Sequence, residues 1–165
     1  MNRQTLKPTE SAKSDDRYAQ ILGAAARLFE ENGFPNTTVR EIARQVNIKS
    51  ASLFYHFKDK DELLYRVMEN TITDIVDRQR VALTEVNDLT ARLRALVKVE
   101  MESFLVERPT QSFETLIHEW RHLKPKQQKK LLKLRADYEQ RWNTVLDECI
   151  AAGLITADRR VTRRI

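Results

Sequence analysis

The sequence has few of the residues that cross-link a chain, break its helices or carry it through a membrane. Its one cysteine, Cys149, excludes a disulfide framework and the paired cysteines and histidines of a zinc finger. Only three glycines and four prolines occur, and no alternation of apolar and polar residues lasts long enough to predict a strand. No apolar run approaches the roughly 18 residues of a membrane span, and the polar N-terminus lacks the apolar stretch of a signal peptide. We therefore expect an all-α, cytoplasmic protein with no membrane attachment.

Charge is abundant and slightly unbalanced. Lys and Arg number 29 against 24 Asp and Glu, which gives a net charge of +5 over 165 residues. A basic balance favours an anionic partner, but by itself it indicates only non-specific association. The length suits one domain, or a small domain fused to a larger helical one.

The first predicted helix spans residues 17–32 and follows a disordered arm over residues 1–16. Its apolar residues recur at helical spacing and form a single stripe. Gly33 follows as a residue free to adopt the left-handed cap conformation. Pro35 then prevents the helix from continuing.

Two shorter helices come next. Thr38 and Glu41 have capping-box spacing, so the second helix is expected to open at Thr38. Asn47, which tolerates positive φ, makes the turn to a third helix over residues 49–57. That helix should bury Leu53 and Phe57 and leave outside Lys49, Ser50, Ser52 and Tyr55.

Longer helices follow. Asp59 is expected to cap a fourth helix with Glu62 as its box partner, and an apolar stripe continues that helix for several turns. Further helices are predicted over residues 88–107, 112–123 and 125–152.

Residues 38–57 have the pattern of a helix-turn-helix. This motif consists of two short amphipathic helices and a tight turn, with a third helix behind them. The second helix of the pair must be polar outside to enter the major groove, while a small apolar core holds it at a fixed angle. Residues 38–57 meet both demands, and this predicts binding to duplex DNA.

Several motifs follow one another in a fixed order near the N-terminus. They are RYAQIL at residues 17–22, LF at 28–29, NGF at 32–34, TTVREIA at 37–43 and LFYHFKDKDELL at 53–64. In order and spacing they resemble the tetracycline-repressor (TetR) family. The resemblance implies a ligand-responsive transcriptional regulator, usually a repressor, that is not an enzyme and needs no cofactor.

Carried over position by position, the resemblance also implies which side chains touch DNA. They are Thr38, Arg40, Lys49, Ser50, Ser52, Tyr55, His56 and Lys60. The residues that open the recognition helix would meet base edges or nearby phosphates, and Tyr55 and His56 would clamp the backbone. Lys60 would add a phosphate contact at the positive end of the fourth helix. Similar proteins usually carry Tyr where this chain has Phe54, so one hydrogen-bond donor is missing, and Phe54 is either a core residue or a non-polar surface residue.

The resemblance divides the chain into a helix-turn-helix domain over residues 17–63 and a helical ligand-binding and dimerisation domain over residues 64–165. In the family, a small effector bound among the C-terminal helices shifts the protein away from its DNA-competent state. The candidate ligand-binding side chains are Phe104, Phe113, Trp120, Tyr138 and Trp142. Tyr138 and Trp142 belong to an apolar stripe, and such a stripe is more often part of the core than of a ligand site.

Seven basic residues with no acid among them lie within residues 121–135. They form either a solvated helix face or a docking surface for an anionic effector such as an acyl-coenzyme A thioester, a class that some members of the family sense. His118 and His122 lie one helical turn apart, which is metal-ligand spacing, but no third ligand stands nearby and no metal site is predicted.

The C-terminal domain is expected to be incomplete. Similar proteins are usually longer by two helices, which form the dimer interface, so the complete chain is expected to be a homodimer on a palindromic operator, where two linked heads bind better than one. A helical module that binds protein rather than DNA is the alternative function. An enzyme is a third possibility, and its one candidate cluster is His118, Glu119 and His122.

Overall fold

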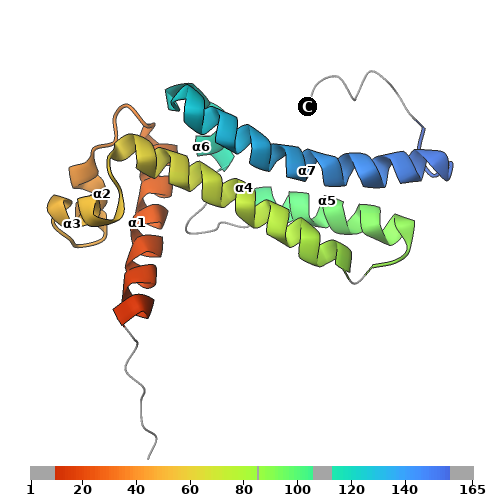
Figure 1. Ribbon diagram of the computed structural model, residues 1–165, viewed down its shortest axis with the longest axis horizontal. Coiled ribbons are helices and arrows are strands. Elements are labelled where there is room, and N and C mark those ends of the chain that lie inside the picture. The colour runs from red at the N-terminus through yellow and green to blue at the C-terminus, as the bar shows by residue number, and fades with distance from the viewer. Residues whose placement is uncertain (1–9, 85, 106–112, 157–165) are drawn as a thin grey trace, which may run out of the picture. The chain divides into compact units, whose positions relative to one another are not determined.

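The computed structural model describes residues 10–84, 86–105 and 113–156, and within these ranges every regular element is a helix (Figure 1). The elements are α1 (Glu10–Asn32), α2 (Val39–Gln45), α3 (Ser50–His56), α4 (Lys60–Thr84), α5 (Leu89–Leu105), α6 (Phe113–His118), the 3-10 helix η1 (Trp120–His122) and α7 (Pro125–Ala151). The all-α prediction is therefore confirmed. No helix in the described part of the chain is both long enough and apolar enough to cross a membrane.

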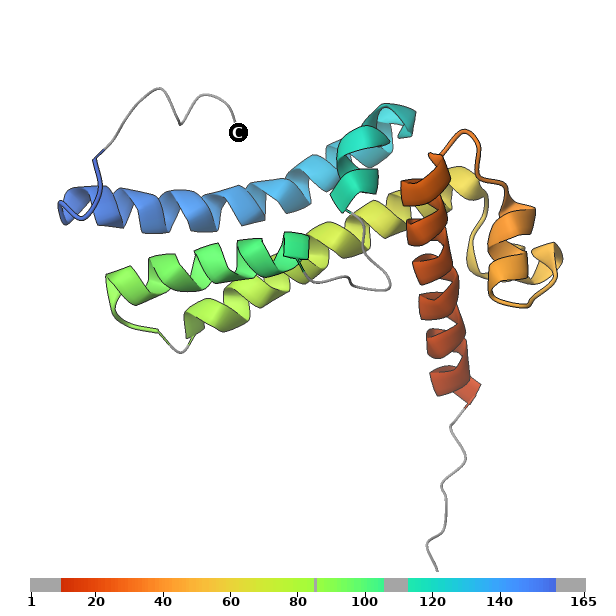
Figure 2. The ribbon, with the colours of Figure 1, turned by 180° about the vertical axis from the view of Figure 1, so that it is seen from behind.

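The chain forms two compact units. The first contains the described residues within 1–71 and 108–128, and the second contains those within 72–107 and 129–165. Helices α1, α2 and α3, with the first turns of α4, make up most of the first unit (Figures 1 and 2).

The core of the first unit holds the helix-turn-helix together. Its fully buried large side chains are Ile21, Phe29, Ile42, Leu53, Phe57, Leu63, Leu64, Val67 and Met68. The Phe57 ring stacks on Tyr18 of α1 with 4.8 Å between the ring centroids. This core fixes α2 and α3 against α1, as the apolar spacing predicted.

Helix α1 begins at Glu10, seven residues before the predicted start at residue 17. The expected disordered arm over residues 1–16 is therefore wrong for residues 10–16, and residues 1–9 lie outside the described residues. Extending an existing helix costs little, since only the first turn carries a nucleation penalty. Near this end, the Asp16 carboxylate accepts a hydrogen bond of 2.8 Å from the Gln20 amide one turn later. Residues 10–16 read ESAKSDD, so no apolar stripe in the sequence signalled the extension.

The predicted start and turn signals around α2 are confirmed. The Thr38 hydroxyl accepts from the backbone N–H of Glu41 at 3.2 Å, and the Glu41 carboxylate accepts from the backbone N–H of Thr38 at 2.7 Å. Gly33, after α1, has φ +77°, and Asn47, between α2 and α3, has φ +54°. These are positions where a left-handed backbone is required and where other residues would be strained.

We expect Thr38→Ala to lower the free energy of unfolding by about 1 kcal/mol, the usual cost of losing an N-cap side chain. The hydrogen bonds from Thr38 hold the pKa of Glu41 below its ordinary value. The stabilisation is therefore present at neutral pH and is lost as the pH falls through that lowered pKa. Urea unfolding at neutral and acidic pH measures both effects. Thr38→Ser, which keeps the hydroxyl, is the control; a Ser variant as unstable as the Ala variant would contradict the capping role.

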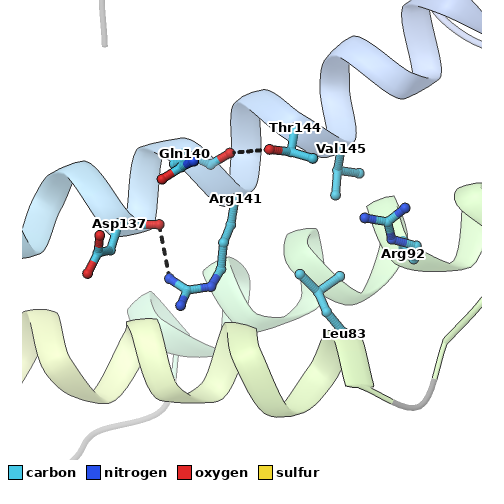
Figure 3. Close-up of a pocket in the computed structure, with 7 residues that line it drawn as sticks. All are labelled: Leu83, Arg92, Asp137, Gln140, Arg141, Thr144 and Val145. Atoms are coloured by element: carbon cyan, nitrogen blue, oxygen red, sulfur yellow. Dashed lines mark hydrogen bonds between the residues drawn. The ribbon is translucent and has the colours of Figure 1, made fainter.

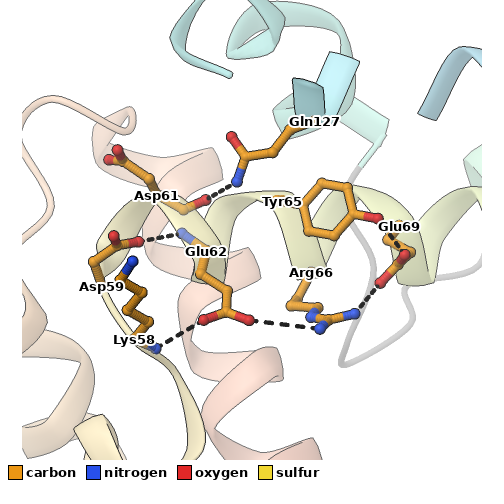
Figure 4. A network of polar contacts seen from close by, with 8 residues as sticks. All are labelled: Lys58, Asp59, Asp61, Glu62, Tyr65, Arg66, Glu69 and Gln127. Atoms are coloured by element: carbon orange, nitrogen blue, oxygen red, sulfur yellow. Dashed lines mark hydrogen bonds and ion pairs between the residues drawn. The ribbon is translucent and has the colours of Figure 1, made fainter. Parts of the chain in front are cut away.

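Helix α4 is capped by Asp59, but not through the predicted box (Figure 4). The Asp59 carboxylate accepts from the backbone N–H of Glu62 at 2.7 Å. The Glu62 carboxylate, however, accepts from the backbone N–H of Lys58 at 2.8 Å and not from that of Asp59. It also lies 3.5 Å from Arg66. Glu62 thus closes the loop before the cap, and only half of the predicted capping box forms.

The start of α4 is also tied to the first turn of α7 within the first unit. The Lys124 ammonium lies 2.9 Å from the Asp61 carboxylate. The Gln127 amide donates to the Asp61 carbonyl at 3.4 Å (Figure 4). A turn further along α4, Tyr65 donates to Glu69, and burial with this hydrogen bond raises the pKa of the Tyr65 hydroxyl to about 12. The phenol therefore remains a hydrogen-bond donor throughout the neutral range.

The helix predicted over residues 112–123 is interrupted. Helix α6 ends at His118, and η1 follows with the tighter i to i+3 bonds of a 3-10 helix. The interruption places Glu119 and Leu123 in the interior, where they are 7% and 5% exposed. The interruption and the burial of these two side chains therefore occur together.

The second unit packs residues 72–84 of α4, α5 and most of α7. Its core cluster centres on the buried residues Leu96, Val145 and Cys149, with Trp142 packed against it. Cys149 is a buried packing residue with a free thiol. Gln79 is completely buried, and neither side-chain polar atom has a hydrogen-bond partner among the described residues.

Candidate nucleic-acid interface

Helix α3 has one buried and one open side. Leu53 and Phe57 are 0% and 1% exposed, whereas Tyr55 is 86% exposed. Lys49, which precedes the helix, is also exposed, and its side chain makes no capping hydrogen bond. The polar side chains of α3 are therefore free to meet a ligand while the apolar ones hold the helix in place.

The eight predicted DNA-contacting residues lie on α2, on α3 and at the ends beside them. Those exposed are Thr38, Arg40, Lys49, Ser52 and Tyr55. Those half-buried are Ser50, His56 and Lys60. The Tyr55 and His56 rings meet edge to face at 5.4 Å between centroids, so the two proposed backbone clamps are neighbours in space as well as in sequence.

Phe54 belongs to the surface. It is 51% exposed, although it stands between the fully buried Leu53 and the open Tyr55. Of the two alternatives left by the sequence, core or non-polar surface residue, the structure supports the second. Its ring offers contact area but no hydrogen bond.

Lys60 has an internal role that the sequence did not reveal. Its ammonium donates to the main-chain carbonyls of Phe34 at 2.7 Å and Thr37 at 2.8 Å, and it lies 4.2 Å above the centre of the Phe34 ring. Lys60 thereby ties the start of α4 to the connection between α1 and α2. One of its three N–H donors remains, so the phosphate contact stays a prediction.

Arg17 is a second positioning residue missed from the sequence. Its guanidinium donates to the main-chain carbonyl of Val46 at 3.2 Å, in the turn between α2 and α3. The two residues are 29 positions apart, and no local pattern links them. This bond holds the turn that sets the angle of the recognition helix.

The open side of this region is positively charged. Four exposed cations have no carboxylate partner among the described residues, and they are Arg40, Arg44, Lys49 and Lys58. The nearby acid, Glu41, is used in the capping box. Exposed cations outside ion pairs create a positive field that attracts phosphates. Arg44 and Lys58 extend the set that the sequence predicted.

The five predicted ligand-binding residues do not form one cluster within either unit. Phe113 and Trp120 belong to the first unit, and Phe104, Tyr138 and Trp142 to the second. The side chain of Phe113 lies outside the described residues, Trp120 is half-buried, and Phe104 is 58% exposed.

Among the predicted ligand-binding residues, Tyr138 and Trp142 lie on the same helix and have polar atoms in the interior. They lie one turn apart on α7, and the Tyr138 hydroxyl donates to the Glu100 carboxylate of α5 at 3.0 Å. Burial and the neighbouring Glu100 carboxylate raise the pKa of Tyr138. The indole N–H of Trp142 is buried without a hydrogen-bond partner of good geometry among the described residues.

The histidine cluster does not assemble a metal site in the part of the chain that is described. His118 is exposed, and the His122 imidazole lies 3.3 Å from the buried carboxylate of Glu119. No group of three potential ligands is close enough among these residues to hold a metal ion.

Comparison with known families gives two matches. The family described as "Bacterial regulatory proteins, tetR family" matches residues 21–67, which include α2, α3 and their turn. The family described as "Tetracyclin repressor-like, C-terminal domain" matches residues 86–165. Together the two matches reproduce the order of the two domains inferred from the sequence.

The chain is also similar to individual proteins. The HTH-type transcriptional repressor KstR2 of Rhodococcus jostii (strain RHA1) is 27% identical over 150 residues, which are 90% of this chain and 72% of KstR2. The regulator BetI of Burkholderia cenocepacia (strain HI2424) is 34% identical over 96 residues, and the match spans only about half of BetI, 48%. Among solved structures, the protein titled superantigen pfit has a TM-score of 0.78 and 42% identity, covering 96% of this chain and 75% of that one.

Proposed function

Because the chain belongs to the tetR family of bacterial regulatory proteins, we propose that it represses transcription from a palindromic operator as a homodimer and is released by a small-molecule effector. The family is one of non-enzymatic transcriptional regulators with an N-terminal helix-turn-helix domain and a C-terminal helical domain. In this proposal α3 enters the major groove, α2 and Tyr55 rest on the phosphate backbone, and the protein acts in the cytoplasm.

The observation that carries the proposal is the division of α3 into two sides. Its apolar side chains are sealed in the core of the first unit, while Lys49, Ser52 and Tyr55 are open. A helix that only packs against other helices does not need a row of exposed hydrogen-bond donors opposite its buried side. Phosphate contacts from the flanking cations would position this row, and the row would read the bases.

Salt dependence tests the DNA-binding proposal directly. A protein that neutralises phosphates releases condensed counterions, so its affinity for a labelled duplex should fall steeply between about 50 mM and about 200 mM salt. Fluorescence anisotropy with a random-sequence duplex measures the slope without knowledge of the operator. An affinity that stays flat across this range would contradict the proposed function.

For the effector we propose an anionic compound, such as an acyl-coenzyme A thioester. Exposed cations on α7 support this: Lys126, Lys129 and Lys133 have no carboxylate partner among the described residues. The basic segment is not uniformly free, however, because Lys124 pairs with Asp61 and Arg135 pairs with Glu139. These two side chains fit the alternative interpretation, a solvated helix face.

A further inference from the structure

The second unit contains a groove that the sequence did not indicate. It has a volume of about 380 Å³ and is lined by Leu83 of α4, Arg92 of α5, and Asp137, Gln140, Arg141, Thr144 and Val145 of α7 (Figure 3). Sites for small molecules in proteins commonly have volumes of about 300–1,000 Å³. The groove therefore has room for a compact organic ligand.

The two guanidinium groups of the groove are in different states. Arg92 forms an ion pair with Glu148, so its charge is balanced within the protein. Arg141 donates to the main-chain carbonyl of Asp137 at 2.9 Å and has no carboxylate partner among the described residues. In Figure 3 the Asp137 carboxylate points away from the Arg141 guanidinium. Arg141 thus presents a half-buried positive charge with donors to spare.

The same groove has an apolar side. Leu83 and Val145 line it, and Val145 is part of the buried cluster with Leu96 and Cys149. A ligand held only by charge would gain nothing from this wall, whereas an apolar chain laid against it would be removed from water. The lining therefore suits a molecule with one acidic end and one apolar end.

Further positive charge lies along α7. Lys129 and Lys133 precede Asp137 by two turns and one turn, so the three residues fall on one side of the helix. Both lysines are exposed and have no carboxylate partner among the described residues. Their field would raise the local concentration of anions near the groove.

We propose that this groove binds an organic anion, a carboxylate or a phosphate monoester on an apolar body, with the acid group on the Arg141 guanidinium. The planar guanidinium donates two parallel hydrogen bonds to such an oxyanion, which is stronger and more directional than a contact from lysine. Leu83 and Val145 take the apolar body. The inference rests on the proposed function, because it gives the effector a chemical class and a place.

Calorimetry with the 165-residue protein and three matched probes tests the inference: octanoate, octyl phosphate and octanol. We expect at least one of the two anions to bind about tenfold or more tightly than octanol, because a charge-assisted hydrogen bond is lost with the alcohol. The tighter of the two anions shows whether the acid group is a carboxylate or a phosphate. Equal affinities for all three probes, or no binding of any probe at millimolar concentration, would overturn the inference.

Variants then assign the contact. Arg141→Gln should weaken anion binding about tenfold while leaving octanol binding unaffected. The anion affinity of Arg141→Lys should lie between that of the parent protein and that of Arg141→Gln. Arg135→Gln, on the same helix but in an ion pair with Glu139, is the matched control. Unchanged anion binding in both Arg141 variants would remove the assignment. Calorimetry without DNA keeps this result separate from the proposed function, whose failure would appear instead as salt-independent DNA binding.

Discussion

Replacing both Lys49 and Tyr55 with alanine is expected to lower the affinity for duplex DNA by about a hundredfold, since one contact of this kind contributes about 1–3 kcal/mol. The stability of the fold should barely change, because exposed side chains outside the core contribute within about 0.5 kcal/mol. Tyr55 is 86% exposed, and the Lys49 side chain makes no capping bond. Anisotropy titration and urea unfolding on the same preparation measure the two quantities.

Two controls separate this effect from a general loss of charge or of ring contacts. Lys98→Ala removes an exposed cation from the second unit and should leave DNA binding nearly unchanged. Tyr55→Phe keeps the ring and removes only the hydroxyl. A partial loss of DNA affinity in this variant would show that the Tyr55 hydroxyl makes a hydrogen bond to DNA. If the double variant unfolds at much lower urea concentration, or binds DNA as the parent does, Lys49 and Tyr55 do not face the groove as we infer.

Phe54 and Phe57 offer a matched pair for the core beneath the recognition helix. Phe57→Ala should lower the free energy of unfolding by about 3–5 kcal/mol, the usual cost of emptying a buried aromatic site. Phe57 is 1% exposed and stacks on Tyr18. Phe54→Ala removes the same ring from a site that is 51% exposed, and we expect a loss of about 0.5 kcal/mol there. Urea unfolding of both variants gives the comparison.

The loss expected for Phe57→Ala is large compared with the stability of a whole domain. A domain is typically stable by about 5–15 kcal/mol, so the variant would lose a large share of its stability. Phe57→Leu, which refills part of the site, should recover some of that loss. Similar losses for Phe54→Ala and Phe57→Ala would show that the two sides of α3 are not divided as the structure has them.

The features that could be predicted from sequence are those set by near neighbours. A capping box needs only Thr38 and Glu41, three residues apart, and a left-handed turn needs only a residue such as Gly33 or Asn47. Apolar spacing likewise placed Leu53 and Phe57 in the core. These preferences act within a few residues, but the context can still change them: Asp59 and Glu62 have the same spacing and form only half of the box.

The features that could not be predicted depend on residues that are distant in the sequence. Lys60 reaches a carbonyl 26 positions away, at Phe34, and Arg92 pairs with Glu148, 56 positions away. The interruption before η1 coincides with the burial of Glu119, a residue that helical spacing alone would leave on a continuous helix. The groove around Arg141 is a product of three packed elements, and its arginines stand in no motif.

The bonds of Lys60 also bear on how many ions leave when the protein meets DNA. Each cation that moves from water to a phosphate releases close to one condensed ion, and the slope of affinity against salt counts these ions. An ammonium already held by the Phe34 and Thr37 carbonyls has little freedom to take up a phosphate. Unless the remaining N–H donor of Lys60 meets a phosphate, the slope counts Arg40, Lys49 and their open neighbours but not Lys60, and a lysine in the family's contact pattern is then silent in the ion balance of binding.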